Sequence, residues 1–162
     1  PNDMATVKLV QSFLVNGSVS LGDYGGNPAT LQIFVEINPV GNPNPVETGV
    51  AVLNSSGAFT FSTSRSSGNY DVYVKAGHWL RKKIANVAFG TNGVSGLSFS
   101  LVNGDCDGDN EVGIGDFAML SVAYGSSLGE LNYNVLTDLN GDQSVDIADY
   151  AILSAMYGRI GD

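Results

Sequence analysis

Cysteine, histidine and long apolar runs are scarce in this sequence, and each scarcity excludes a class of protein. The single cysteine, Cys106, rules out an internal disulfide and a cysteine-based metal cluster. No apolar stretch approaches the roughly 20 residues that a helix needs to cross a bilayer. A secreted chain without disulfides has to be stabilised in another way, and a bound metal ion is one such way.

The only histidine, His78, lies in the segment GHWLRKK beside Trp79 and three basic residues. A catalytic triad would need a serine or cysteine partner in three dimensions, and we expect His78 at a turn or strand end instead. Trp79 could form a sugar-stacking platform with Tyr70 and Tyr73, although packing in a β-sandwich core is the favoured interpretation. We therefore predict no catalytic residues, no organic cofactor and no enzyme.

Basic residues are also few, and the acidic residues are concentrated at one end. The chain carries 7 basic and 16 acidic residues, for a net charge of −9. Residues 1–104 hold five acids and six bases, a net +1, whereas residues 105–162 hold eleven acids and one base, a net −10. That acidic third would repel phosphate, which disfavours nucleic acid as a partner. The 21 glycines and the charged fraction of 14% are typical of a turn-rich protein outside the cell or at its surface.

The first residues, PNDMATVKLV, contain neither an initiator methionine nor a signal-peptide pattern, so we expect a processed chain or a fragment. The segment ATVKLVQSFLV has strand character. It predicts that residues 1–13 form an extra N-terminal strand, or a donor strand that inserts into the sheet of a neighbouring subunit.

Residues 14–102 show the apolar alternation of β-strands. TLQIFVEI, GAFTFST, YDVYVKA and GLSFSLV are rich in β-branched and aromatic residues, and turn clusters separate them. This pattern predicts an antiparallel β-sandwich in a chain that is mainly β with a small α part. LVNGSVSLGDY and SSGNYDVYVKAGHWLRKK resemble the opening strand and a later hairpin of transthyretin-like, carboxypeptidase-regulatory-type β-sandwiches. That likeness implies a non-catalytic stalk, spacer or assembly module.

Residues 105–125 and 138–158 are an internal duplication. They lie 33 residues apart and share 11 identities in 21 aligned positions. Each begins with twelve Asp-rich residues, DCDGDNEVGIGD and DLNGDQSVDIAD, and continues with apolar residues at helical spacing, such as Phe117, Leu120 and Tyr124. The duplication predicts two acidic loops, each followed by one helix, in a domain of residues 103–162.

Both loops place oxygen-bearing side chains where a twelve-residue EF-hand-type loop binds Ca²⁺. Asp or Asn stands at loop positions 1, 3, 5 and 12, and position 7 offers a backbone carbonyl. We therefore predict two Ca²⁺ ions, with the metal ligands Asp105, Asp107, Asp109, Glu111, Asp116, Asp138, Asn140, Asp142, Ser144 and Asp149. Position 6 requires a left-handed backbone, which Asn110 tolerates and Gln143 adopts at a cost of about 1 kcal/mol. Val112 and Val145 at position 8 would pair the two loops, and Cys106 at position 2 would point outward.

Because position 12 is Asp and no helix precedes the first loop, residues 103–158 resemble a type I dockerin module. The resemblance implies two structural Ca²⁺ ions and docking on a cohesin partner through loop positions 10 and 11 and nearby helix residues. The corresponding residues here are Ile114, Gly115, Val122, Ala123, Ile147, Ala148, Ala155 and Met156. They are apolar or small, where cellulosomal dockerins often carry hydroxyl and basic groups. Two alternatives stay open: these residues face a partner, or they pack on the chain's own sandwich.

Together these features favour a non-catalytic, extracellular, calcium-stabilised structural or assembly protein. Its partner would be a further copy of the chain or a cohesin-like surface scaffold. The alternative is a dockerin-bearing anchoring fragment of a larger secreted enzyme or carbohydrate-binding protein that docks on a cohesin. A sugar-binding sandwich is a third hypothesis, and it depends on Trp79. The sequons at Asn16 and Asn54 offer sites for glycan attachment.

Overall fold

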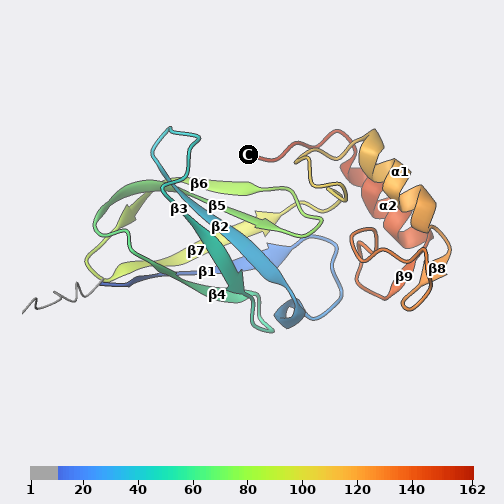
Figure 1. Cartoon of the computed structure of the whole chain (residues 1–162), viewed down its shortest axis with the longest axis horizontal. Helices are drawn as coiled ribbons and strands as arrows, with labels where there is room; N and C mark the ends of the chain where they lie inside the picture. The colour runs from blue at the N-terminus through green and yellow to red at the C-terminus, as the bar shows by residue number, and fades with distance from the viewer. Residues whose placement is uncertain (1–10) are drawn as a thin grey trace, which may run out of the picture.

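Seven strands between Phe13 and Leu101 form two facing β-sheets in the computed structural model, which describes residues 11–162 (Figure 1). One sheet has the strand order β4-β1-β7 and the other has the order β3-β2-β5-β6. The strands are β1 (Phe13–Leu21), β2 (Gln32–Pro39), β3 (Glu47–Val52), β4 (Ala58–Thr63), β5 (Gly68–Ala76), β6 (Lys82–Phe89) and β7 (Gly93–Leu101). A short 3-10 helix, η1 (Pro28–Thr30), lies between β1 and β2.

The mainly β, sandwich-like fold agrees with the alternation in the sequence, but the sandwich is not wholly antiparallel. β1 runs parallel to β7, with Gly17 opposite Leu97 and Leu21 opposite Leu101. The other strand pairs of these two sheets are antiparallel. Alternation reports which side chains face the core. It carries no information about the direction of a neighbouring strand. β7 follows β6, a strand of the opposite sheet, and the chain then crosses over to lie beside β1.

Alternate side chains of the strands fill the space between the sheets. On β2, Ile33 and Ile37 have no exposed surface. Trp79, just beyond β5, is 1% exposed, and its ring packs edge-on against Tyr24 with centroids 5.3 Å apart. Its Nε1 donates a hydrogen bond to the carbonyl oxygen of Gly22 at 3.2 Å. A ring enclosed in this way cannot stack on a sugar, so Trp79 is a core residue and the sugar platform is excluded.

After β7 the chain forms two repeats of an acidic loop and a helix. The helices α1 (Ile114–Ala123) and α2 (Ile147–Met156) lie side by side, and the two-residue strands β8 (Ser126–Ser127) and β9 (Ser144–Val145) pair with each other (Figure 1). These elements enclose a second, smaller core of Leu80, Cys106, Val112, Leu120, Ala123, Leu139, Val145 and Leu153. The helical spacing in both repeats therefore identified the two helices correctly.

The valines at loop position 8 do not pair with each other, and that prediction is wrong. The N–H of Gly125 donates to the carbonyl of Val145 at 2.8 Å, and the N–H of Gly158 donates to the carbonyl of Val112 at 2.8 Å. Each loop thus pairs with the segment that follows the helix of the other repeat, and both valines are fully buried. The duplication made the two positions equivalent, but it did not reveal which backbone each one meets.

Turns of the sandwich hold the two loops from two sides. Between β1 and β2, the N–H of Gly25 donates to the carbonyl of Asn140 in the second loop at 2.9 Å. Between β5 and β6, the N–H of Arg81 donates to Oδ1 of Asn110 in the first loop at 2.8 Å. The neighbouring Leu80 belongs to the second core. The sandwich and the loops are therefore joined by both polar and apolar contacts.

Residues 1–10 lie outside the described part of the chain, so the extra strand or donor strand expected over residues 1–13 stays a prediction, although Phe13 itself begins β1. The expected domain boundaries, 14–102 and 103–162, likewise stay predictions. None of the helices in residues 11–162 is long and apolar enough to cross a membrane.

Candidate functional site

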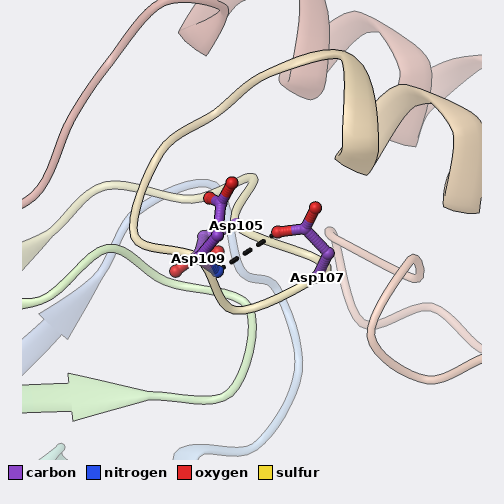
Figure 2. A group of neighbouring side chains, drawn as sticks. All are labelled: Asp105, Asp107 and Asp109. Carbon is purple, nitrogen blue, oxygen red and sulfur yellow. Dashed lines mark hydrogen bonds between the residues drawn. The ribbon is translucent and has the colours of Figure 1, made fainter.

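The first acidic loop brings three carboxylates together. Asp105, Asp107 and Asp109, at loop positions 1, 3 and 5, each place one oxygen within 4.8 Å of the others (Figure 2). Two oxygens bound to one Ca²⁺ ion at about 2.3–2.6 Å can be at most about 5 Å apart. The spacing of the cluster therefore fits one Ca²⁺ ion. Asp105 is buried at the base of the loop, while the other two carboxylates are exposed.

The second loop has fewer carboxylates at the same positions. Asp138 and Asp142 stand at positions 1 and 5, but position 3 is Asn140, whose amide donates to Oδ2 of Asp142 at 3.0 Å. An amide oxygen can also bind Ca²⁺. The second loop therefore carries less negative charge at these positions, but it still presents oxygen atoms at all three. At position 7, the N–H groups of Glu111 and Ser144 each donate to the position-5 carboxylate of their own loop at 2.9 Å.

Both loops turn at position 6 through a residue with a left-handed backbone, as predicted. The φ angle is 72° at Asn110 and 73° at Gln143. Position 4 is glycine in both loops, with φ of 82° at Gly108 and 76° at Gly141. Because glycine adopts positive φ at little cost and other residues do not, the strained position is Gln143.

The carboxylate at position 12 closes each loop onto the start of its helix. Asp116 accepts backbone N–H bonds from Cys106, Asp107 and Gly113 at 2.6, 3.1 and 2.6 Å. Asp149 accepts the equivalent three N–H bonds, at 2.7, 3.2 and 2.8 Å. Burial raises the pKa of Asp149, and these N–H donors offset part of that rise. Position 12 thus holds each loop together through backbone hydrogen bonds.

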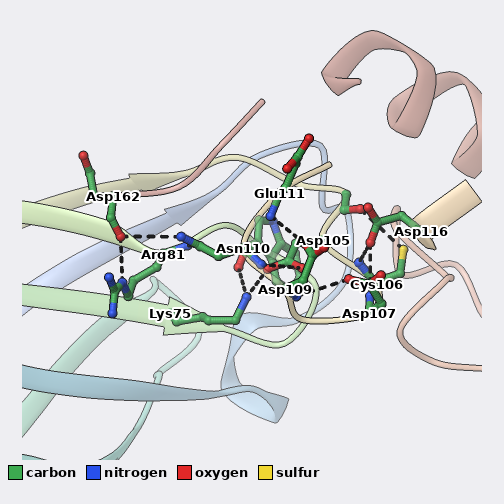
Figure 3. A network of polar contacts seen from close by, with 12 residues as sticks. Lys75, Arg81, Asp105, Cys106, Asp107, Asp109, Asn110, Glu111, Asp116 and Asp162 are labelled. Atoms are coloured by element: carbon green, nitrogen blue, oxygen red, sulfur yellow. Dashed lines mark hydrogen bonds and ion pairs between the residues drawn. The ribbon is translucent and has the colours of Figure 1, made fainter. Parts of the chain in front are cut away.

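The carboxylate at position 1 receives an additional donor from outside the loop, and this donor differs between the repeats. In the first loop, Lys75 of β5 forms an ion pair with Oδ2 of Asp105 (Figure 3). In the second loop, the hydroxyl of Tyr133 donates to Oδ2 of Asp138 at 2.7 Å. Burial raises the pKa of Tyr133, as do its bond to Asp138 and the surrounding carboxylates. The donor is therefore charged in one loop and neutral in the other.

Cys106 points inward, which corrects the prediction that it points outward. It is 2% exposed, and its Sγ lies 3.6 Å from the carbonyl oxygen of Gly104. Burial, together with nearby carboxylates, raises the pKa of its thiol to about 12. The equivalent residue of the second loop, Leu139, is also fully buried. Position 2 is therefore a core position, and an intermolecular disulfide through Cys106 is excluded in this fold.

His78 lies in the turn that follows β5, as expected, and it is buried. The pKa of His78 is lowered to about 4, mainly by burial. Hydrogen bonds with the backbone of Val135 and Leu136 raise this pKa, but by less than burial lowers it. Its own carbonyl accepts the N–H groups of Gly104 and Asp105, each at 2.9 Å. His78 therefore supports the first loop through its backbone.

Seven of the eight predicted docking residues reach the surface at least in part, and Ala123 does not. Ile114 is 72% exposed and Ile147 is 63% exposed at loop position 10, and Val122 is 75% exposed on α1. The described part of the sandwich therefore does not cover them. Ala123 is 1% exposed because its face of α1 turns toward the second core, so it drops out of the docking surface.

Three aromatic residues on the helices were predicted to share a helix face but were not included among the docking residues. Phe117, Tyr124 and Tyr150 line a groove of about 400 Å³ between the helices, together with Leu120, Ser121 and Ile147. The rings of Phe117 and Tyr150 meet edge to face, 5.8 Å apart. The duplication contained a signal, because Phe117 and Tyr150 occupy the same place in the two repeats.

No protein-family model matches the sequence, and no curated protein matches it. The fold is similar to solved structures. One is a chain from a C-terminal interface mutant of a type II cohesin–X-dockerin complex of Acetivibrio cellulolyticus, with a TM-score of 0.71 and 25% identity over 92% of this chain and 97% of that one. Another is a chain from an N-terminal interface mutant of a type II cohesin–X-dockerin complex of the same organism, with a TM-score of 0.67 and 22% identity over 93% and 97% of the two chains.

These comparisons correct the resemblance inferred from the sequence. The matching structures belong to type II complexes, and the likeness extends over the β-sandwich as well as the helices. The described chain is mostly β, with only two α-helices of ten residues each. A type I dockerin module behind a transthyretin-like sandwich is therefore the wrong description. Loop spacing reports ligand placement only, whereas the comparison measures how the whole chain packs.

Proposed function

We propose that this chain is a non-catalytic, extracellular or cell-surface, calcium-stabilised module that takes part in a protein–protein contact of the cohesin–dockerin kind. The observation that carries the proposal is the exposed apolar groove between α1 and α2. It lies on a chain whose fold is similar to structures from type II cohesin–X-dockerin complexes. Nothing in those comparisons supports an anchoring fragment of a larger secreted enzyme.

The groove has the composition of a docking surface. Ile147 lines it as a largely exposed aliphatic side chain, and Phe117 and Tyr150 are 37% and 39% exposed. A contiguous apolar patch of this kind marks an interaction site more often than a free surface. Aromatic anchors next to aliphatic residues are also typical of the residues that dominate binding energy.

Calcium binding is supported by the chemistry of the donor set. We propose one Ca²⁺ ion in each loop, held by the predicted oxygen ligands, with the carboxylate cluster of Asp105, Asp107 and Asp109 as the main support. The ions would offset the charge of carboxylates that the fold buries, and they would supply no bond-breaking chemistry. At millimolar extracellular Ca²⁺, a site with about micromolar Kd stabilises the fold by roughly 4 kcal/mol.

A binding measurement tests the docking proposal. The cohesin and the X-dockerin of a type II complex are immobilised separately, and binding of this chain to each is measured in millimolar Ca²⁺. We expect one of them to bind. Phe117→Ala combined with Tyr150→Ala should weaken that binding by more than about tenfold, because two aromatic anchors are lost. The control is Val52→Ala, which truncates an apolar side chain of the sandwich that is 58% exposed and should leave binding unchanged.

Binding to neither partner would contradict the proposal, and so would equal effects of the groove and control substitutions. Light scattering of the chain alone decides about self-association. A doubled mass that depends on Phe117 and Tyr150 would make a further copy of the chain the occupant of the groove. A monomer leaves the groove to a different protein.

A further inference from the structure

The two proposed calcium loops differ in what holds their first carboxylate. The first loop carries five acidic residues between positions 1 and 12, and the second carries four. On charge alone, the first loop should attract a divalent cation more strongly. The contacts around position 1 reverse that expectation.

In the first loop, the carboxylate at position 1 already has a cation. The side chain of Asp105 has no exposed surface, and its Oδ2 is paired with the ammonium of Lys75. A second bond, from Nζ of Lys75 to the carbonyl oxygen of Trp79 at 3.0 Å, holds that ammonium in place. Figure 3 shows Lys75 reaching from β5 of the sandwich toward the loop. Among the ion pairs of residues 11–162, this is the one that involves a loop carboxylate.

In the second loop, the carboxylate at position 1 has no cationic partner among the described residues. Asp138 accepts the hydroxyl of Tyr133, and the backbone N–H groups of Gly141, Asp142 and Gln143 at 2.9, 3.2 and 2.9 Å. These donors are neutral, so they orient the carboxylate without cancelling its charge. A divalent cation bound at Asp138 would therefore displace no ion-pair partner among the described residues.

We infer that Lys75 acts as a built-in competitor for the cation of the first loop, so that this loop binds Ca²⁺ more weakly than the second. The inference rests on the proposed calcium binding. An ion bound at Oδ2 of Asp105 would displace the ammonium or lie within a few ångströms of it, and like charges at that separation repel strongly in a buried site. Lys75 belongs to the sandwich, so loading of the first loop also weakens a bond between the sandwich and the loop.

The test uses the full chain, labelled with ¹⁵N, in a Ca²⁺ titration followed by NMR. Gly108 and Gly141 stand at position 4 of the two loops and report on each loop separately. In the native chain, the amide of Gly141 should shift at a lower Ca²⁺ concentration than the amide of Gly108. In Lys75→Met, the midpoint of Gly108 should move to about tenfold lower Ca²⁺, while the midpoint of Gly141 stays unchanged.

Two control variants separate the local effect from the loss of one positive charge. Lys75→Arg keeps the cation and should leave the order of filling as in the native chain. Lys82→Met removes an equal charge that is 52% exposed and paired with Asp162 at 2.9 Å, and it should shift both midpoints by less than about twofold because solvent screens that charge.

The order of filling in the native chain decides the inference even if Lys75→Met does not fold. If Gly108 shifts first, or together with Gly141, the inference is overturned. The same holds if Lys75→Met folds and the midpoint of Gly108 stays within about twofold of native. If neither amide responds to millimolar Ca²⁺, the calcium proposal itself fails, and that result is distinct from both amides shifting in the wrong order.

Discussion

The sandwich and the C-terminal repeats are stabilised in different ways, although they share one chain. The sandwich core consists of 18 buried apolar residues, whereas the core beneath the two helices consists of 8. Buried apolar area is the main favourable term in folding. The C-terminal region has much less of it and carries a net charge of −10, whereas residues 1–104 carry +1. We therefore expect the C-terminal region to depend on a further source of stability more than the sandwich does.

Buried carboxylates sharpen this difference. The sandwich buries one carboxylate, Asp71, while the loops bury four: Asp105, Asp116, Asp138 and Asp149. A buried charge is costly unless it is paired or hydrogen-bonded. Each loop carboxylate accepts backbone N–H bonds, but among the described residues only Asp105 of these four has an ion-pair partner. Two Ca²⁺ ions would supply the missing positive charge, which is the physical basis of the calcium proposal.

The largest expected effect is the removal of Ca²⁺, because it should separate the two regions. Two micromolar sites in millimolar Ca²⁺ contribute about 8 kcal/mol in total, which exceeds what a small core alone supplies. We expect chelation to abolish the helical circular dichroism of α1 and α2 while the fluorescence of Trp79, in the sandwich core, stays native. Helical signal that survives chelation unchanged would show that the smaller core is sufficient by itself.

A matched pair of cavity substitutions tests the comparison next. Leu153 and Leu53 are 1% and 2% exposed in the two cores, and Leu→Ala at either should cost about 2–5 kcal/mol. For Leu153→Ala we expect a lower helical melting temperature that rises steeply with Ca²⁺. For Leu53→Ala we expect a lower sandwich melting temperature that is independent of Ca²⁺. Thermal melts followed by both signals test this. If both signals changed in a single shared transition, the two regions would not be stabilised separately.

The buried carboxylate of the sandwich predicts a pH dependence that owes nothing to metal. Backbone N–H bonds from Asn86, at 2.8 Å, and from Gly41, at 3.0 Å, lower the pKa of Asp71. A folded-state pKa below the unfolded one means that the stabilisation is present above about pH 4 and is lost as the pH falls through the folded-state value. Asp71→Asn should cost about 1–3 kcal/mol at neutral pH, and its urea midpoint should fall less steeply in acid.

The smallest effect concerns the backbone of the loops. Gln143 has a φ of 73°, so Gln143→Gly should stabilise the C-terminal repeats by about 0.5–1 kcal/mol. Asn110 has a similar φ, but its Oδ1 also accepts the N–H of Arg81. Asn110→Gly should therefore give no gain or a loss. Calcium-loaded melts of the two variants would refute this reasoning if both moved in the same direction by the same amount.

Particular elements show how far the sequence alone could be read. Alternation over residues 14–102 predicted a sandwich, and the duplication predicted two loops with helices. Left-handed φ at Asn110 and Gln143 followed from the loop spacing. The parallel pairing of β1 with β7, the inward direction of Cys106 and the burial of Ala123 did not follow, because each depends on a neighbour that is distant in the sequence.

The proposed docking surface divides in the same way. The repeats revealed apolar residues at Ile114 and Ile147, but the groove lined by Phe117, Tyr124 and Tyr150 exists only because the two helices lie side by side. The likeness to structures from type II complexes also required the whole fold, since the loop pattern alone pointed to a type I module.

By itself, the sequence determined the periodicity of each region, the charge asymmetry and the spacing of the oxygen-bearing side chains in both loops, because these depend on residue type and on neighbours within a few positions. The tertiary structure alone decided the contact of Lys75 with Asp105 and the groove between the helices. It alone also decided that Val112 and Val145 each pair with the segment after the helix of the other repeat. These features join residues that are 20 or more positions apart, and local pattern carries no information about which distant residues the folded chain brings together.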